Sequence, residues 1–163
     1  MRQHGWSLVE LMVVCVVLAI VATVSGPAMG NLITRINLTS TTTDFISAVH
    51  LTRSTAVRQG KVVVLCPTAD GESCEPEGDY ADGWLVTNDH GDPGETLRHW
   101  PATEATLAVN FPGDSYVRFS PDGLPRQAGG AFLAGTARFC LNGKEKRVII
   151  SRNGRVRTED DEC

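Results

Sequence analysis

The sequence lacks the short motifs that mark the common enzyme classes. It has no Gly-x-Ser-x-Gly nucleophile elbow, no His-Glu-x-x-His metal motif and no P-loop. His50, His90 and His99 stand apart from any cysteine or carboxylate motif. These absences argue against hydrolase, metalloprotease and nucleotide-binding chemistry, so the sequence predicts a protein that is not an enzyme and that uses no cofactor.

Cysteine pairs with the C-x-x-C spacing of zinc sites are also missing, and no metal site is predicted. Cys15 lies in an apolar run, where it is predicted to behave as a small hydrophobic residue. The other four cysteines allow three disulfide pairings in an exported domain. We favour Cys66–Cys74, which would close a short acidic loop, and Cys140–Cys163, which would join the C-terminus to a strand.

Basic residues are scarce in the middle of the chain. Residues 66–115 hold eleven acids and one base, Arg98, whereas residues 138–157 hold seven bases and one acid, Glu145. Residues 159–162 are acidic again. A division of charge of this kind points to an interaction face. The first acidic segment matches no EF-hand spacing and is interpreted as a solvated loop rather than a calcium site; its acids are Asp70, Glu72, Glu75, Glu77, Asp79 and Asp82.

Residues 8–24 contain almost no polar side chain apart from Glu10. An ionised carboxylate inside a membrane segment costs about 2.5–3.5 kcal/mol on insertion scales. A secretory signal peptide, a plain membrane anchor and a buried helix of a soluble core are three alternatives for this run. Glu10 argues against the first two, and nothing later in the chain is apolar enough to surround the third. A carboxylate here is explained best by a positive partner inside an assembly.

The remaining pattern predicts one long helix followed by strands. Apolar residues recur at spacings near three and four up to Gln59-Gly60, with an interruption at residues 39–43 and an expected kink or end at Pro27. A helix over residues 6–59 would measure roughly 80 Å at 1.5 Å per residue, which suits a filament subunit. Turn signals then separate short segments rich in Val, Ile and aromatic residues, predicted as strands at 61–66, 83–87, 96–99, 116–120, 137–140, 147–151 and 155–158. The class is α+β, with a mostly antiparallel sheet.

The N-terminus carries a family resemblance. Gly5-Trp6-Ser7-Leu8-Val9-Glu10-Leu11 resembles the class III leader junction of type IV pilins and type II secretion pseudopilins. The resemblance implies that a prepilin peptidase cleaves between Gly5 and Trp6 and that the new N-terminus at Trp6 is methylated. It also implies that Glu10 pairs with the terminal ammonium of a neighbouring subunit, which removes much of its cost in lipid. The family usually has phenylalanine at the position of Trp6.

Later motifs extend the resemblance over most of the chain, to the FimT/GspH family of minor pilins and pseudopilins. They are residues 47–58, Val64-Leu65-Cys66-Pro67 with Asp70-Gly71 and Cys74, Asp82-Gly83-Trp84-Leu85-Val86, and Phe119-Ser120-Pro121-Asp122-Gly123. The family often has glutamate where this chain has Thr55. The resemblance implies a pilin-like fold with four parts: leader peptide 1–5, transmembrane and assembly helix 6–26, amphipathic continuation 27–60, and sheet domain 61–163.

The C-terminal segment holds the sharpest candidate site. Asn153-Gly154 between apolar runs predicts a hairpin. In it, Arg152 is expected to face Arg155, with Arg157 on the same face. Like charges placed together are destabilising unless an anion meets them. Gly154, Arg155 and Arg157 also match the Gly-Arg-x-Arg motif that the family links to DNA binding in natural transformation. The surrounding bases are predicted to widen the patch: Lys144, Lys146 and Arg147.

Two functions follow from the resemblance and stay open here. One is a minor pilin of a type IV pilus that binds double-stranded DNA non-specifically. The other is a structural subunit that primes pilus assembly or the type II secretion pseudopilus without binding DNA. A solvated hairpin tip, neutralised by residues 159–162, suits the second. In both, the partners are other pilin or pseudopilin subunits and the prepilin peptidase. The implied location is the inner membrane of a Gram-negative bacterium, as a single-pass protein with its sheet domain in the periplasm, and then the filament.

Overall fold

The computed structural model describes residues 7–88, 96–111, 113 and 115–163, without the side chains of residues 22–28. The chain divides into two compact units, Met1–Ile36 and Asn37–Cys163. One helix, α1 (Leu8–Gln59), begins in the first unit and ends in the second. It continues through Pro27 as a single element, so the expected end of a helical segment there is wrong. Over the described residues, no helix combines the length and apolarity needed to cross a membrane.

The part of α1 in the second unit is amphipathic. Its buried residues recur mainly at spacings of three and four, as expected for a helix that packs on one face: Leu38, Thr42, Phe45, Ala48, Val49, Thr52, Thr55 and Ala56. The helix ends at Gly60, whose φ of 65° lies in the left-handed region and whose N–H donates to the carbonyl of Ala56 at 3.0 Å. Val57, although apolar and close to the end of the helix, lies off this buried face and is 53% exposed.

Residues 39–43, where the apolar stripe of the sequence is interrupted, lie within the continuous helix α1, which accommodates their threonines. The hydroxyl of Thr42 donates to the carbonyl of Leu38 at 2.6 Å, and that of Thr43 donates to Thr39 at 2.8 Å. Each hydroxyl is thereby satisfied within its own helix, so Thr42 can be buried at 3% exposure. Polar threonine therefore contributes to the packed face instead of breaking it.

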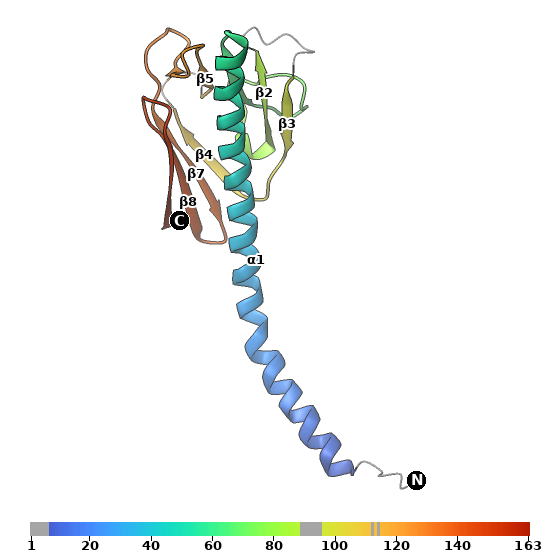
Figure 1. The fold of residues 1–163 in the computed structure, drawn as a ribbon. Helices are drawn as coiled ribbons and strands as arrows, with labels where there is room; N and C mark the ends of the chain where they lie inside the picture. The colour runs from blue at the N-terminus through green and yellow to red at the C-terminus, as the bar shows by residue number, and fades with distance from the viewer. Residues whose placement is uncertain (1–6, 89–95, 112, 114) are drawn as a thin grey trace. The chain divides into compact units, whose positions relative to one another are not determined.

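The strands form two antiparallel sheets rather than one (Figure 1). The first has the order β3-β2-β1-β5-β6 and the second the order β4-β7-β8-β9. Two strands, β4 and β6, were not expected from the sequence. The bounds are β1 Val63–Pro67, β2 Gly83–Asn88, β3 Arg98–Pro101, β4 Thr106–Asn110, β5 Val117–Phe119, β6 Pro125–Arg126, β7 Gly135–Leu141, β8 Lys144–Ile150 and β9 Val156–Glu162, with a short 3-10 helix at Tyr80–Asp82.

Phe45 of α1 connects the two sheets in the core. Its ring makes edge-on contacts at 5.3–5.8 Å between centroids with Trp84 of β2, Phe139 of β7 and Tyr80. All four side chains are at most 2% exposed. Because one helical side chain touches residues of both sheets, the helix and the sheets share a single hydrophobic core in this unit.

Two disulfides cross-link this unit. Cys66 of β1 bonds to Cys74, and Cys140 of β7 bonds to Cys163 at the C-terminus. This is the pairing that we favoured among the three possibilities. Cys15 is free and exposed.

Candidate functional site

The candidate site is the hairpin between β8 and β9. Ile150 pairs with Val156, and the N–H of Ser151 donates to the carbonyl of Arg155 at 3.0 Å. The N–H of Gly154 donates back to the carbonyl of Ser151 at 2.8 Å, with Gly154 at a φ of 74°. Three residues, 152–154, therefore make the loop, and its last position needs the left-handed conformation that glycine adopts without strain.

This register corrects the predicted arrangement of the arginines. Arg155 lies opposite Ser151, so the prediction that Arg152 faces Arg155 is wrong; Arg152 is the first residue of the loop. Arg157 lies opposite Ile149 in the ladder. The prediction assumed a two-residue loop, and one extra loop residue shifts the pairing by one position. Arg155 and Arg157 still alternate onto the same side of their strand, and all three arginines are exposed.

A residue from the helix positions this loop. The Arg53 guanidinium of α1 donates through Nη1 to the carbonyl of Gly154 at 3.0 Å. A Cβ added at Gly154 would lie 3.1 Å from Arg53 Nη1 and 3.3 Å from the carbonyl oxygen of Gly123. Gly154 is buried, whereas the arginines on either side of it are exposed. The close contact at Gly154 thus holds the loop backbone, from which the arginines extend, against the helix.

Sequence reasoning missed Arg53. It lies 101 residues from Gly154, and on the helix it looks like any half-exposed arginine. The only sequence signal for this contact is the pair of glycines at positions 123 and 154. They belong to two separate turns, and both lie close to the Arg53 side chain, where a larger residue would be crowded.

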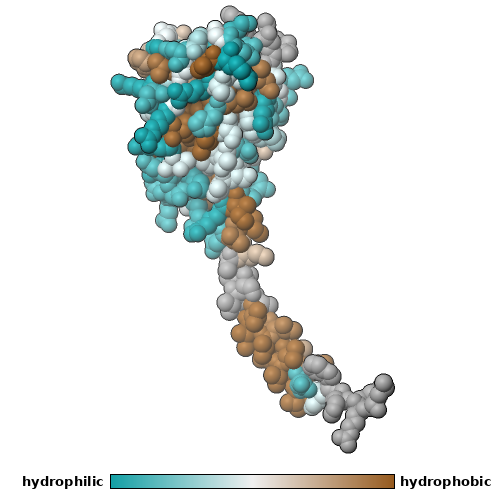
Figure 2. Space-filling model, viewed as in Figure 1, coloured by the Kyte–Doolittle hydropathy of each residue, from teal (hydrophilic) through white to brown (hydrophobic). Residues whose placement is uncertain are grey.

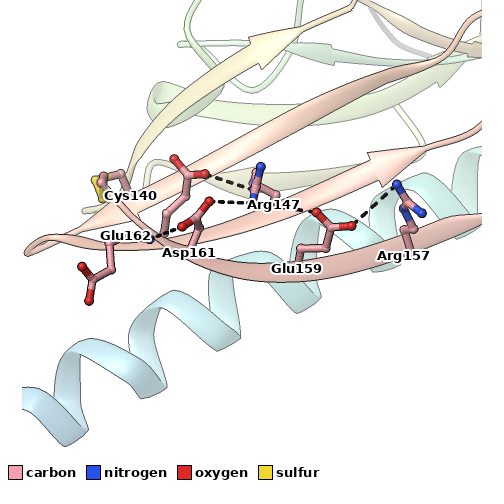
Figure 3. Close-up of polar contacts among 8 residues, drawn as sticks. Cys140, Arg147, Arg157, Glu159, Asp161 and Glu162 are labelled. Atoms are coloured by element: carbon pink, nitrogen blue, oxygen red, sulfur yellow. Dashed lines mark hydrogen bonds and ion pairs between the residues drawn. A yellow bond between two sulfur atoms is a disulfide. The ribbon is translucent and has the colours of Figure 1, made fainter.

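Two of the three bases expected to widen the patch, Lys146 and Arg147, pair with acids of β9; Figure 3 shows the contacts of Arg147. Lys146 Nζ lies 2.6 Å from Asp160, and Arg147 Nη2 lies 2.6 Å from Asp161 and 3.8 Å from Glu159. The Nε of Arg147 lies 3.3 Å from Glu145 on its own strand. Lys144 lies opposite Glu162 in the ladder. Lys146 and Arg147 therefore serve mainly to hold β9 on β8.

The positive charge that is left on the hairpin lies at its tip. Within the described residues, Arg152 and Arg155 have no acidic partner. Arg157 has Glu159 at 3.6 Å, but its side chain is 65% exposed, and exposed pairs of this kind contribute about 0–1 kcal/mol. The tip is thus a small basic surface that meets solvent, next to an acidic strand end.

The turn beside the hairpin keeps its own charges paired. The pKa of Asp122 lies below its usual value, because its carboxylate accepts hydrogen bonds from the Ser120 hydroxyl and the Leu124 N–H. Arg126 pairs with the same carboxylate at 3.2 Å. Asp122 therefore stays ionised and paired with Arg126, so it does not neutralise the arginines of the hairpin.

The acidic loop after β1 is organised by its own backbone. The N–H groups of Ser73 and Glu72 donate to Asp70, as do the hydroxyls of Ser73 and Thr68, and these bonds lower the pKa of Asp70 well below its usual value. The Cys66–Cys74 disulfide closes the loop. Since the oxygens of Asp70 are used in this turn, the geometry fits a self-contained loop.

At the other end of the chain, Glu10 lies in the first turn of α1 with its side chain exposed. The predicted cleavage site, Gly5 and Trp6, lies outside the described residues. Exposed apolar side chains surround Glu10 on the helix: Leu8, Val9, Leu11, Met12 and Val13. Figure 2 shows this segment as largely hydrophobic. In the sequence, Glu10 is the only carboxylate among residues 8–43.

Comparisons with known proteins agree with this architecture. Residues 41–154 match the family of the type II transport protein GspH, and residues 1–26 match the prokaryotic N-terminal methylation motif. The structure is similar to that of the type IV minor pilin FimU of Pseudomonas aeruginosa, with a TM-score of 0.58 and 22% identity over 77% of this chain and 90% of that one. A second crystal form of FimU gives 0.56 and 20% over 74% and 91%. At these identities the likeness is one of fold. No curated protein sequence matches the chain.

Proposed function

Since this chain belongs to the family of the type II transport protein GspH, and so is a prepilin-like minor pilin or pseudopilin, we propose that it joins a type IV pilus and binds DNA there. The observation that carries the DNA-binding part is the exposed hairpin tip. Arg152 and Arg155 project without an acidic partner in the described structure, and Arg53 holds the loop between them in one position. Guanidinium groups held in this way suit the phosphates of a DNA backbone.

The N-terminal segment is the basis for the assembly part of the proposal. Cleavage between Gly5 and Trp6 by a prepilin peptidase, followed by methylation of Trp6, would make Trp6 the positive terminus and Glu10 the fifth residue of the cleaved chain. The helix would first sit in the inner membrane, with the sheet domain in the periplasm. In the filament, Glu10 would pair with the terminal ammonium of a neighbouring subunit, since the carboxylate lies alone on an apolar surface.

We expect replacement of Arg155 and Arg157 by glutamine to abolish retention of double-stranded DNA. Three phosphate contacts at the hairpin contribute about 2–3 to the magnitude of the slope of log Kd against log salt concentration, and the loss of two of them lowers that magnitude by about 2. The full chain in a non-ionic detergent is titrated with a DNA duplex in a mobility-shift assay at several salt concentrations. A matched control, Arg35→Gln with Arg138→Gln, removes the same charge from exposed positions elsewhere and should bind normally. Unchanged retention by the hairpin variant would exclude this site.

A second candidate is a structural subunit that primes filament assembly, in a pilus or in a type II secretion pseudopilus. The pairing of Lys146 and Arg147 with acids of β9 favours it, because most of the predicted basic patch serves to hold two strands together. In this case the arginines at the tip would keep the end of the hairpin soluble.

Deletion of the gene separates the two candidates. DNA capture predicts that transformation is lost while pili and protein secretion persist; loss of pili or of secretion would favour the structural role. In either case, a Glu10→Leu variant should fail to restore the lost activity, since it cannot pair with a terminal ammonium. Full restoration by Glu10→Leu would contradict the role assigned to Glu10. Immunoblots of sheared filaments report whether the variant enters the filament.

A further inference from the structure

A second basic surface lies on α1, separate from the hairpin tip. Eight residues line a hollow along the last turns of the helix in the second unit. Two are apolar, two are serines, and the other four are arginines or histidine, with no acid among them: Ser47, His50, Leu51, Arg53, Ser54, Val57, Arg58 and Arg98. On the face shown in Figure 2, hydrophilic side chains gather around an apolar strip in this unit.

The basic side chains reach this hollow from two elements. His50, Arg53 and Arg58 come from the exposed side of α1, opposite its buried stripe. Arg98 comes from β3, and its guanidinium lies over the Trp100 ring at 4.7 Å from the centroid. The indole holds this guanidinium in place through a cation–π contact and supplies no negative charge. Arg98 is thus held in place, and no acid among the described residues pairs with it.

No counterion for these arginines is found in the part of the chain that the structure describes. Arg58 and Arg98 make no ion pair there. Lys146 and Arg147 of β8, in contrast, pair with acids of β9. Like charges that converge on one hollow repel each other, and this repulsion is relieved when an anion enters. The contrast indicates that the fold pairs its bases where they hold strands together and leaves them free at this hollow.

Arg53 connects this hollow to the hairpin. The same side chain lines the hollow and donates to the carbonyl of Gly154 in the loop. Arg53 thus lies between the hollow, with Arg58 and Arg98, and the loop that carries Arg152. A ligand that contacts both must be long, repeatedly anionic and able to follow an open surface.

We propose that the hollow lined by Arg53, Arg58 and Arg98 is a second contact region for the backbone phosphates of a nucleic-acid duplex. The proposal rests on the proposed function, because it extends the hairpin site across α1 to β3. The guanidinium groups of Arg58 and Arg98 contact phosphates beyond those met by the hairpin. Arg53 holds the two regions in a fixed relation, since it takes part in both.

The test compares the salt dependence of duplex binding by four forms of the full chain in a non-ionic detergent. They are the wild type, Arg58→Gln with Arg98→Gln, Arg155→Gln with Arg157→Gln, and the control Arg35→Gln with Arg138→Gln. Fluorescence anisotropy with a labelled 30-base-pair duplex gives Kd at each salt concentration. We expect the Arg58/Arg98 variant to lower the magnitude of the log–log slope by about 2 relative to the control, and Arg58→Lys with Arg98→Lys to restore it.

Each outcome decides between the two claims. A wild-type slope in the Arg58/Arg98 variant, with retention lost in the hairpin variant, overturns the second region and leaves the hairpin site standing. A reduced slope in the Arg58/Arg98 variant, with normal binding by the hairpin variant, supports the hollow and overturns the hairpin. Competition by poly-L-glutamate as effective as competition by unlabelled duplex, charge for charge, overturns the assignment to phosphates and shows a surface for acidic protein instead.

Discussion

Replacement of Phe45 by alanine is expected to lower the free energy of unfolding of the second unit by about 3–5 kcal/mol. The ring is fully buried and makes edge-on contacts with Tyr80, Trp84 and Phe139. Its loss leaves a cavity between both sheets and the helix, and the three surrounding rings belong to separate elements that cannot all move in to fill it. Denaturant titration followed by tryptophan fluorescence measures the change, because Trp84 lies against the ring.

A matched control is Phe132→Ala. Phe132 is 49% exposed and lies outside the core, where it stacks under the guanidinium of Arg126. We expect a loss of about 1 kcal/mol or less there. If Phe45→Ala costs no more than Phe132→Ala, the helix and the two sheets do not share a single core, and the packing argument for α1 is wrong.

The buried face of α1 shows what sequence patterns cannot predict. The helix and most strands follow from spacing and turn residues, which are local features. The apolar stripe was incomplete because threonines stand at positions that periodicity assigns to apolar residues. In the structure the hydroxyls of Thr42 and Thr52 donate to carbonyls one turn back, at 2.6 and 2.7 Å, and both residues are buried. Self-satisfied hydroxyls make these positions act as apolar ones, and a hydropathy pattern does not show this.

The division into two sheets depends on non-local pairing. The strand β4 was not expected, and it pairs with β7, whose residues follow about 30 positions later, as in Leu107 opposite Phe139. Nothing in the short segment Thr106–Asn110 specifies that partner. Its alternation of one buried and one exposed residue matches an edge strand, but too few residues carry the pattern for it to stand out.

Only part of the candidate site could be predicted, because the rest of it also depends on non-local pairing. The hairpin follows from Asn153-Gly154, which is local, whereas its register depends on one loop residue. Once that register is known, residues 144–147 of β8 necessarily lie opposite the four acids of β9 at 159–162. The register therefore places Lys146 and Arg147 beside the carboxylates that neutralise them. The contact between Arg53 and Gly154 spans 101 residues, and no spacing rule predicts it.

Removal of the disulfide between Cys140 and Cys163 is expected to lower the free energy of unfolding by about 3 kcal/mol. The bond closes a loop with a sequence separation of 23, and its loss frees that loop in the unfolded chain. It also frees the end of β9, an edge strand whose side chains are mostly exposed. Cys140→Ser with Cys163→Ser tests this, in a Cys15→Ser background that removes the free thiol.

Hydrogen exchange locates the effect within the unit. Amides of β9 should lose protection before those of β1, which is fully buried at the centre of the other sheet. The matched comparison is Cys66→Ser with Cys74→Ser, whose sequence separation of 8 predicts a smaller loss, about 2.5 kcal/mol, in the chain-entropy model. Fraying of β9 should also move Asp160 and Asp161 away from Lys146 and Arg147, and so raise the affinity for a DNA duplex. Equal stability with and without Cys140–Cys163 would show instead that the ion pairs and the ladder hold β9 without the covalent bond.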